Sequence, residues 1–548
     1  MDPLSVAGLT LAVFDQLWKL GNHTAVLISN FRDFDNDVKL LENKIRDENI
    51  RTRALQMLLF EPSTVYGGNS MFEYFDSEVQ EQIHMFLEQA SDILSLAHDL
   101  LVRRLERSPA NSDWNLGAVS EKLTTLHTLP SGSTISSERR PSPFQRLRWS
   151  FCDKKRVESI VRDYGELNAR IHESIKLWCL STSIGVDLQH LKHLESDENS
   201  RILGFDVDAK LQIATTSTLS VSRSLEMQDP DVQRSVCDVR HSGDALGVFK
   251  INGQPVVAEY RQYSPGSPSW VALDDRTRDV VERLANILHQ PKEVIFRTPS
   301  CVGWVRHTQL NRIAFIFSIP PNLEPNPLSL LHMLSSKEVR PPSLSQRFQL
   351  AHKLAQCISQ LQLVKWWHSP HAQVHESFRS ENIVFFPTAG SPEASLLEEP
   401  DVTEPWVFGF DLSRPEKYFS SGETDDCVAR EIYRHPDRQR QPSKPFSKIY
   451  DIYALGIVLL EIGLWQPALS LEKHNFSRAS EPAAIRNHMV NQANKRLGSK
   501  MGEKYKMIVL KCLQGSFNLG GDANEDVGLQ QAFRAQVVDV LRKATECI

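Results

Sequence analysis

The chain has 548 residues, of which 41% are hydrophobic and 24% charged, and its formal net charge at pH 7 is −6. This composition is ordinary for a soluble globular protein long enough for roughly two to four domains, and the mild charge argues against general nucleic-acid binding. The eight cysteines show no Cys-x-x-Cys pair and no paired Cys/His spacing. That pattern argues against a metal site or a secreted disulfide framework, and for a reducing, cytoplasmic compartment.

The N-terminus carries an uncharged, largely apolar run from Pro3 to Phe14. It is too short to span a bilayer, which takes about 20 residues, and Asp2 stands where a signal peptide would be basic. The run therefore predicts a helix that is buried in a bundle, or one that moves between a bundle and a membrane. The candidate membrane-active residues are Leu4, Val6, Leu9, Leu11, Val13 and Phe14. Gly8 and Gly21 around the run would ease its release.

Apolar residues at helical spacing predict long amphipathic helices over residues 31–45, 79–101 and 157–178. With the N-terminal run, they predict an all-α helical bundle of at least four helices over residues 1–195. A basic stretch from Arg139 to Arg156 precedes the last helix. It indicates a solvated loop and helix start in preference to an anionic-lipid contact.

Three stretches of this bundle carry a family resemblance. They are Asp2-Pro3-Leu4-Ser5-Val6-Ala7-Gly8-Leu9, Arg148-Trp149-Ser150-Phe151-Cys152-Asp153-Lys154-Lys155 and Asn168-Ala169-Arg170-Ile171. Together they resemble the HeLo domain of fungal proteins. The resemblance implies an α-helical bundle whose N-terminal helix, in several family members, is released to permeabilise membranes in incompatibility-type cell death.

Residues 196–235 have a different composition, with an acidic start and a Ser/Thr-rich run over 214–222. We expect a linker here. The run has some strand propensity, so an aggregating signalling motif is the alternative.

From residue 236 the pattern becomes mixed. Two strands around a turn are predicted over 243–249 and 254–263, followed by a helix over 278–289. Two further strands at 302–306 and 312–319 precede a long helix at 344–367.

The next stretch, from His375 to Phe386, resembles a protein-kinase catalytic loop, in which His-Arg-Asp is followed after four residues by Asn and then by an apolar strand. His375 and Asn382 match, but Ser377 stands in the place of the catalytic Asp. A serine hydroxyl is not a base near neutral pH, so the proton acceptor of the reaction is missing.

The other catalytic parts that this resemblance implies are also degenerate. Gly243 and Gly247 stand where a Gly-rich loop is expected, but the spacing of its glycines is lost. The strand that should carry a lysine offers Glu259, Tyr260 or Arg261, depending on register. Arg261 would approximate the lost charge, whereas Glu259 would repel a phosphate.

The metal-binding Asp-Phe-Gly corresponds to Gly409-Phe410-Asp411, which removes the Mg²⁺ ligand from the first position. Residues with a structural role in kinases match the kinase pattern better than the catalytic ones do. Asp451 matches the aspartate of the large-lobe helix that holds the catalytic loop, and residues 433–437 resemble the Ala-Pro-Glu segment.

The fold class expected is therefore multidomain, with an all-α bundle followed by an α+β bilobal protein-kinase-like domain over residues 236–548. We predict a pseudokinase rather than an enzyme. No cofactor is required, although ATP with or without Mg²⁺ is compatible with weak binding at Gly243, Gly247, Arg261 and Asn382.

Three functions follow from these resemblances. The first is a signalling effector of fungal cell-death type, whose bundle self-associates or acts on anionic membranes when the pseudokinase releases it. An upstream sensor protein and relocation to the plasma membrane belong to that hypothesis. The second is an atypical active kinase that uses Arg261 and Asp411. The third is a non-lytic interaction scaffold.

Overall fold

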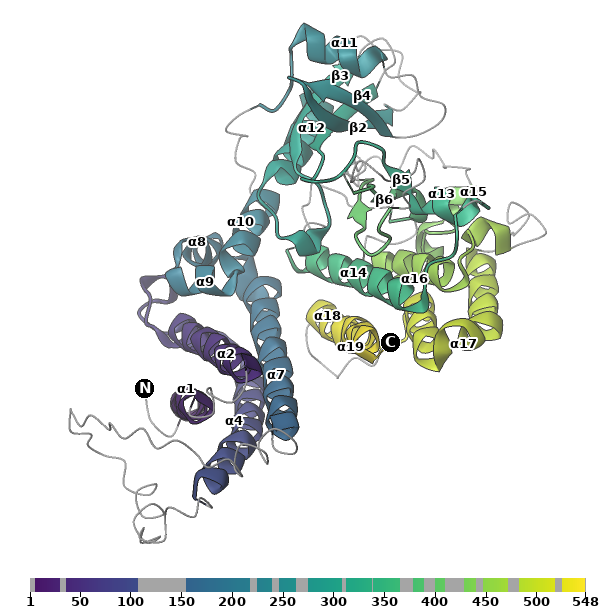
Figure 1. The fold of residues 1–548 in the computed structure, drawn as a ribbon. Helices are drawn as coiled ribbons and strands as arrows, with labels where there is room; N and C mark the ends of the chain where they lie inside the picture. Colours follow the sequence, from purple (N-terminus) through teal and green to yellow (C-terminus); the bar gives the residue numbers. More distant parts are fainter. Residues whose placement is uncertain are drawn as a thin grey trace. The chain divides into compact units, whose positions relative to one another are not determined.

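The computed structural model divides the chain into two compact units. Unit 1 comprises residues 1–179 and 193–206, and unit 2 comprises residues 180–192 and 207–548. The residues that the structure describes are 5–29, 36–106, 154–216, 224–238, 246–262, 275–307, 312–337, 339–364, 378–388, 400–409, 428–439, 447–471, 482–517 and 525–547 (Figure 1).

Unit 1 is helical, as the sequence predicted. Its long helices are α1 (Val6–Ser29), α2 (Asn36–Phe60), α4 (Ser77–Glu106) and α7 (Lys154–Ser181), with the short helices η2 (Thr64–Tyr66) and α3 (Met71–Tyr74) between α2 and α4. Helix α1 packs against both α2 and α4. The apolar residues that recur at steps of three and four are buried in α4 and α7, for example Ile83, Leu94, Val161 and Ile175.

The segment expected to be a linker contains three helices over its described residues. These are α9 (Glu198–Leu203), α10 (Phe205–Thr216) and α11 (Pro230–Asp238), preceded by η5 (Ser183–Val186) and α8 (Leu188–Ser196). Asp197 caps α9 by accepting a hydrogen bond from the amide of Ser200, and α10 buries Phe205 and Leu211 completely. The segment 196–235, predicted as a linker, thus contains helices that bury apolar residues.

A four-stranded antiparallel sheet opens the mixed part of unit 2. Its strands are β1 (Leu246–Ile251), β2 (Gln254–Gln262), β3 (Cys301–His307) and β4 (Arg312–Ser318), in the order β1-β2-β4-β3. Asn252 and Gly253 both have left-handed backbone angles, as the tight turn between β1 and β2 requires. Helix α12 (Asp275–His289) packs on one face of this sheet through Val281 and Ala285, and α11 packs on the other through Val232.

The rest of unit 2 is mainly helical around a small three-stranded sheet. The sheet consists of β5 (Leu328–Ser329), β6 (Ile383–Phe385) and β7 (Trp406–Val407). The helices are α13 (Leu330–Ser335), α14 (Leu344–Leu363), α15 (Val428–Glu431), α16 (Lys448–Leu464), α17 (Pro482–Gln514), α18 (Glu525–Phe533) and α19 (Asp539–Cys547), with short helical turns η6 (Val294–Phe296), η8 (Ser380–Asn382), η10 (Pro436–Arg438) and η11 (Ala468–Leu471), and the π-helical turn η13 (Arg534–Val538) between α18 and α19.

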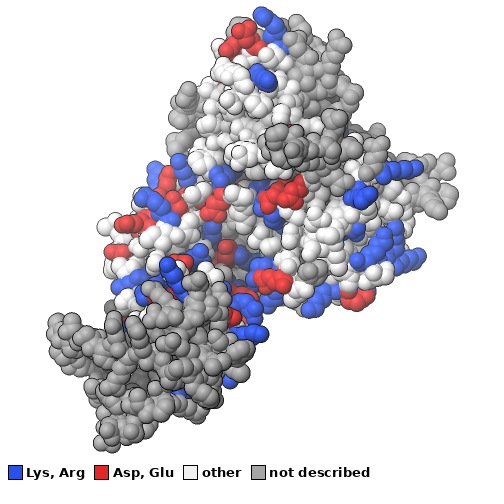
Figure 2. All heavy atoms as spheres, viewed as in Figure 1, with Lys and Arg blue, Asp and Glu red and all other residues white. Residues whose placement is uncertain are grey.

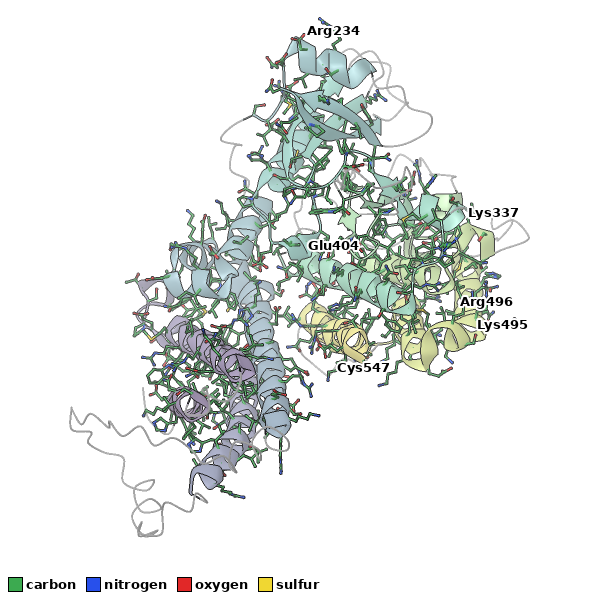
Figure 3. All side chains as sticks on the ribbon, in the orientation of Figure 1. Arg234, Lys337, Glu404, Lys495, Arg496 and Cys547 are labelled. Carbon is green, nitrogen blue, oxygen red and sulfur yellow. The ribbon has the colours of Figure 1, made fainter. Side chains whose placement is uncertain are left out.

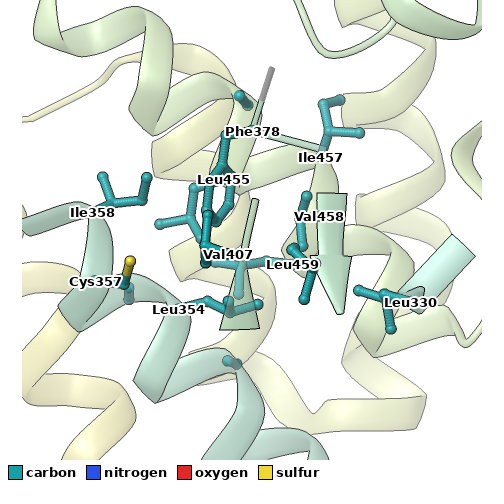
Figure 4. Close-up of a cluster of buried hydrophobic side chains, with 14 of the residues drawn as sticks. Leu330, Leu354, Cys357, Ile358, Phe378, Val407, Leu455, Ile457, Val458 and Leu459 are labelled. Carbon is teal, nitrogen blue, oxygen red and sulfur yellow. The ribbon is translucent and has the colours of Figure 1, made fainter. Parts of the chain in front are cut away.

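Helix α16 forms the centre of this helical part. Its apolar residues from Ile452 to Leu464 are buried, and Figure 4 shows Leu455 and Val458 among side chains of α14, β7 and Phe378. A helix that is apolar on every side is stable only when neighbours surround it. The continuous apolar run in the sequence therefore predicts its central position.

Candidate functional site

Several of the predicted site residues lie outside the described residues. These are Leu4, Gly243, His375, Ser377, Phe410 and Asp411, and the side chain of Arg261. Gly247 lies within β1, where it pairs with Ala258 of β2. Glu259, Tyr260, Asn382, Gly409 and Asp451 are also described.

The register of β2 decides which of its residues reaches Gly409. Residues alternate between the two faces of a strand. Ala258 and Tyr260 pack with the apolar residues under α11, whereas Val257 packs with the residues on the α12 side. Glu259 lies on the same face as Val257, and its carboxylate, 1% exposed, reaches Gly409.

Three residues from distant parts of the sequence meet at this point. Oε1 of Glu259 accepts a hydrogen bond of 2.5 Å from the amide of Gly409. The amide of Phe408 donates to the carbonyl of Asn382 at 2.9 Å, because β6 and β7 pair Ile383 with Val407. We call Glu259, Asn382 and Gly409 the closed site.

Gly409 is required at its position for two reasons. Its φ is +88°, a conformation that L side chains rarely adopt. A Cβ atom there would also lie 2.1 Å from Nδ2 of Asn382. The glycine that replaces the expected metal-binding aspartate is therefore held by packing, and a carboxylate would not fit in this arrangement.

The segment that leads to Gly409 is anchored by charged side chains. Glu404, labelled in Figure 3, accepts hydrogen bonds from Arg297 and from Lys353 of α14. Burial acts to raise the pKa of Glu404, but the hydrogen bonds from Lys353 and Arg297 outweigh it, and the pKa is lowered. The amide of Val407 also donates to the carbonyl of Arg297 at 2.7 Å.

The buried glutamate of α12, Glu282, is engaged by donors at the edge of the four-stranded sheet. Glu282 accepts hydrogen bonds from the amide of Leu225 and, at 2.5 Å, from the indole nitrogen of Trp304. The resemblance to a kinase implied that a glutamate of this helix pairs with a lysine of the strand. Here a glutamate stands on the strand, and the α12 carboxylate is engaged by backbone and indole donors.

A second cluster of buried polar groups surrounds Glu461 of α16, and the sequence did not predict it. Tyr433 donates to Oε1 of Glu461 at 2.7 Å, the same oxygen accepts from the amide of Ala468 at 2.7 Å, and the hydroxyls of Ser380 and Tyr433 lie 2.8 Å apart. Burial raises the pKa of the Glu461 carboxyl to about 7. The signal in the sequence was one acidic residue inside the apolar run of α16.

Asp451, the predicted scaffold residue, lies in the first turn of α16 and is 2% exposed. A buried aspartate at that position is compatible with a structural role. Among the residues that the structure describes, no three His, Cys, Asp or Glu side chains form a group that could hold a metal ion.

The apolar N-terminal helix presents part of its predicted segment to solvent. Val6 is 38% and Leu9 46% exposed, Leu11 and Val13 are half-buried, and Phe14 is fully buried. No helix in the described ranges is both long and apolar enough to cross a bilayer.

Polar contacts also hold α1 against α2. Asn49 donates to the carbonyl of Trp18 at 3.1 Å, and Gln56 donates to Asp15 at 2.8 Å. A Cβ atom at Gly21 would lie 2.0 Å from Oδ1 of Asn49. Gly21 therefore permits close packing of the two helices.

Acidic and basic side chains are interspersed over much of the described surface on the face drawn in Figure 2. Such a mixed surface is typical of a solvated face and does not single out a binding region there.

Residues 316–545 match the model of a family described as a domain of unknown function (DUF7580). The match extends from β4 to α19 and includes Asn382, Gly409 and Asp451, but neither Glu259 nor unit 1. No curated protein matches the chain. The family description assigns no activity to the matched region.

Proposed function

We propose that this chain is a signalling protein whose C-terminal unit is a kinase-like domain without phosphoryl transfer, and whose N-terminal helical region is the output. The observation that carries the first part is the hydrogen bond between Glu259 and Gly409 in the closed site.

The order of the elements supports a kinase-like arrangement. The β1–β2 hairpin, helix α12, strands β3 and β4, and the long helix α14 follow one another in the sequence that the resemblance implies. Asn382 then precedes β6, Gly409 follows β7, and Asp451 lies in the first turn of the buried helix α16. The described landmarks Asn382, Gly409 and Asp451 therefore follow the order that the resemblance implies.

The charge of the closed site argues against catalysis. Phosphoryl transfer depends on cations that neutralise the phosphates, namely a lysine and Mg²⁺. At the closed site the strand provides a buried carboxylate, and the position of the metal-binding aspartate is a glycine. A carboxylate beside a phosphate is repulsive, and low exposure strengthens this repulsion because the effective dielectric constant is reduced.

The output that we propose is self-association or action on an anionic membrane, of the fungal incompatibility or cell-death type. The exposed apolar side chains of Val6 and Leu9 on α1 support it, because such side chains gain free energy when another chain or a lipid surface covers them. An upstream sensor protein would act on the kinase-like unit, and the protein would relocate from the cytoplasm to the plasma membrane.

An interaction scaffold is the second candidate, and the packing of α1 favours it. The close approach at Gly21 and the hydrogen bonds from Asn49 and Gln56 fasten α1 to α2. A scaffold would keep these contacts under all conditions, whereas a membrane effector would break them.

The closed site is tested by nucleotide binding and phosphotransfer on the full chain. We expect no shift of the thermal midpoint with ATP, with or without Mg²⁺, and no transfer of labelled phosphate to the chain or to a generic substrate. Mg²⁺-dependent transfer that is lost in Asp411→Ala would instead establish the active-kinase alternative.

The output is tested with the full chain and dye-loaded vesicles that contain phosphatidylserine. We expect leakage that falls in Val6→Glu and Leu9→Glu and persists in Gln16→Glu, which places the same charge at an exposed polar position of α1. Absence of leakage and of self-association, with α1 amides protected from hydrogen exchange throughout, would favour the scaffold.

A further inference from the structure

The outer edge of the four-stranded sheet is occupied by a short stretch of the same chain. We call residues 224–229 the edge segment. The carbonyl of Leu225 accepts a hydrogen bond of 3.0 Å from the amide of Trp304, and the amide of Met227 donates one of 2.8 Å to the carbonyl of Trp304. The segment thus forms a parallel bridge with β3, which is the last strand of the sheet.

Three consecutive side chains of the edge segment have different partners. Leu225 packs against the apolar residues on the α12 side of the sheet, and Met227 packs against those on the α11 side. Glu226, between them, accepts a hydrogen bond of 2.7 Å from Arg278 of α12. Leu225, Glu226 and Met227 thus each have a partner at this edge.

Glu282 of α12 joins the edge segment to the sheet. Its carboxylate, 7% exposed, accepts from the amide of Leu225 and from the indole of Trp304. Hydrogen bonds to a carboxylate are stronger than those between neutral groups. One buried side chain thus holds α12, β3 and the edge segment at the same point.

Gly303 makes the close approach feasible. A Cβ atom at this position would lie 2.6 Å from the carbonyl oxygen of Leu225 and 2.9 Å from Cε of Met227. The register of β3 also shifts between Cys301 and Gly303. Irregularities of this kind are common on edge strands and change how an edge accepts a further strand.

We propose that the outer edge of β3 is a binding site for an extended segment of the pattern apolar–acidic–apolar, and that the chain's own edge segment occupies it reversibly. Extended peptides bind to sheet edges through backbone hydrogen bonds, with side chains providing specificity. Here the backbone contributes two bonds to β3 and one to Glu282, and Leu225, Glu226 and Met227 are only half-buried. Few contacts and partial exposure are the properties of a segment that opens locally. The inference does not depend on the proposed function.

Hydrogen exchange on the full chain tests whether the edge segment is held as described. In the wild-type chain we expect protected amides at Leu225 and Met227. Gly303→Ala should raise their exchange rates about tenfold or more, and Arg278→Ala, which removes an exposed ion pair, should raise them by a smaller factor. Gly528→Ala is the matched control, because a Cβ atom there meets nothing within 4 Å.

Reversible binding requires that release leaves the rest of the unit folded. Amides of α16 should therefore keep their protection in all three variants. Unchanged exchange at Leu225 and Met227 in Gly303→Ala would overturn the proposal. Loss of α16 protection in Arg278→Ala would also overturn it, because the edge segment would then be an integral part of the fold.

A peptide added in trans tests the site itself. Met227→Pro removes the amide that bonds to Trp304 and so releases the edge, while Gly303 stays in place. A labelled peptide of residues 222–230 should bind to full-chain Met227→Pro more tightly than to the wild-type chain, in which the tethered segment competes at a high effective concentration.

Charge reversal provides the specificity control. The same peptide with lysine in place of Glu226 should bind Met227→Pro weakly, and binding should recover when the chain also carries Arg278→Glu. Equal binding of both peptides to Met227→Pro, or no binding of either, would contradict the proposal.

Discussion

The amide nitrogen of Gly409 lies 2.5 Å from Oε1 of Glu259, although 150 residues separate them in the chain. This contact joins strand β2 to the segment that follows β7. The closed site is therefore filled by residues of the chain itself. Substitutions in it should change the free energy of unfolding of unit 2.

Replacement of Gly409 by alanine should destabilise unit 2 strongly. The left-handed φ and the overlap with Asn382 together should cost about 2–4 kcal/mol, measured as a lower midpoint of urea unfolding. Gly515→Ala is the matched control, because Gly515 also has a positive φ (66°) but a Cβ atom there would meet only Ile449, at 3.4 Å. If both variants lower the free energy of unfolding by the same amount, the overlap with Asn382 contributes nothing.

Gly21→Ala should loosen α1 in unit 1. The added methyl group would overlap the Asn49 side chain that bonds to the α1 backbone, and we expect a loss of about 1–3 kcal/mol with faster hydrogen exchange in α1. Gly165→Ala provides the comparison within the same unit, because its Cβ would meet the flexible end of Lys44 at 3.3 Å and Oε1 of Glu48 at 3.8 Å, which is ordinary contact. Faster α1 exchange in Gly165→Ala than in Gly21→Ala would contradict the expectation.

Glu461 should make the stability of unit 2 fall as the pH rises. Burial raises the pKa of its carboxyl from 4.5 to about 7, so the native state holds a proton that the unfolded chain loses between these values. The stabilisation is present below pH 4.5 and is lost as the pH rises to about 7; at most it amounts to about 3 kcal/mol.

Glu461→Gln tests this pH dependence, because glutamine resembles the protonated side chain and keeps an oxygen for Tyr433 and Ala468. Its unfolding midpoint should exceed that of the wild-type chain at pH 8 and approach it near pH 5. A wild-type slope that persists in this variant would assign the dependence to other groups.

His352 should act in the opposite direction at acid pH. Burial first, and then the nearby charges of Arg542 and Lys353, lower its pKa from 6.5 to about 4. The unfolded chain therefore binds a proton before the native state does, and stability is lost as the pH falls from 6.5 toward 4.

His352→Leu should reduce that acid-side loss. Nε2 of His352 has no hydrogen-bond partner among the residues described, so leucine removes no such bond. His332→Leu, at an exposed position of α13, is the control for the removal of a histidine. Equal acid sensitivity of the wild-type chain and His352→Leu would exclude this histidine as the cause.

Local patterns predicted many of the elements well. The hairpin of β1 and β2, helix α12, strands β3 and β4, and helix α14 all lie close to the expected ranges, because strand alternation and helical spacing are properties of neighbouring residues. The segment 196–235 was harder to predict. Its helices α9 and α10 are stabilised by burial of residues such as Phe205 and Leu211, and their composition alone indicated a linker.

The amino-acid sequence by itself determined that this protein has a helical N-terminal region and a later mixed region. Only the tertiary structure decided that Glu259 reaches Gly409, since the register of β2 depends on its pairing with β4. It also decided that Gly21 and Gly303 are sites of close approach. The physical reason is that a glycine's role depends on the atom that comes nearest to it, and in these cases that atom belongs to a distant part of the chain.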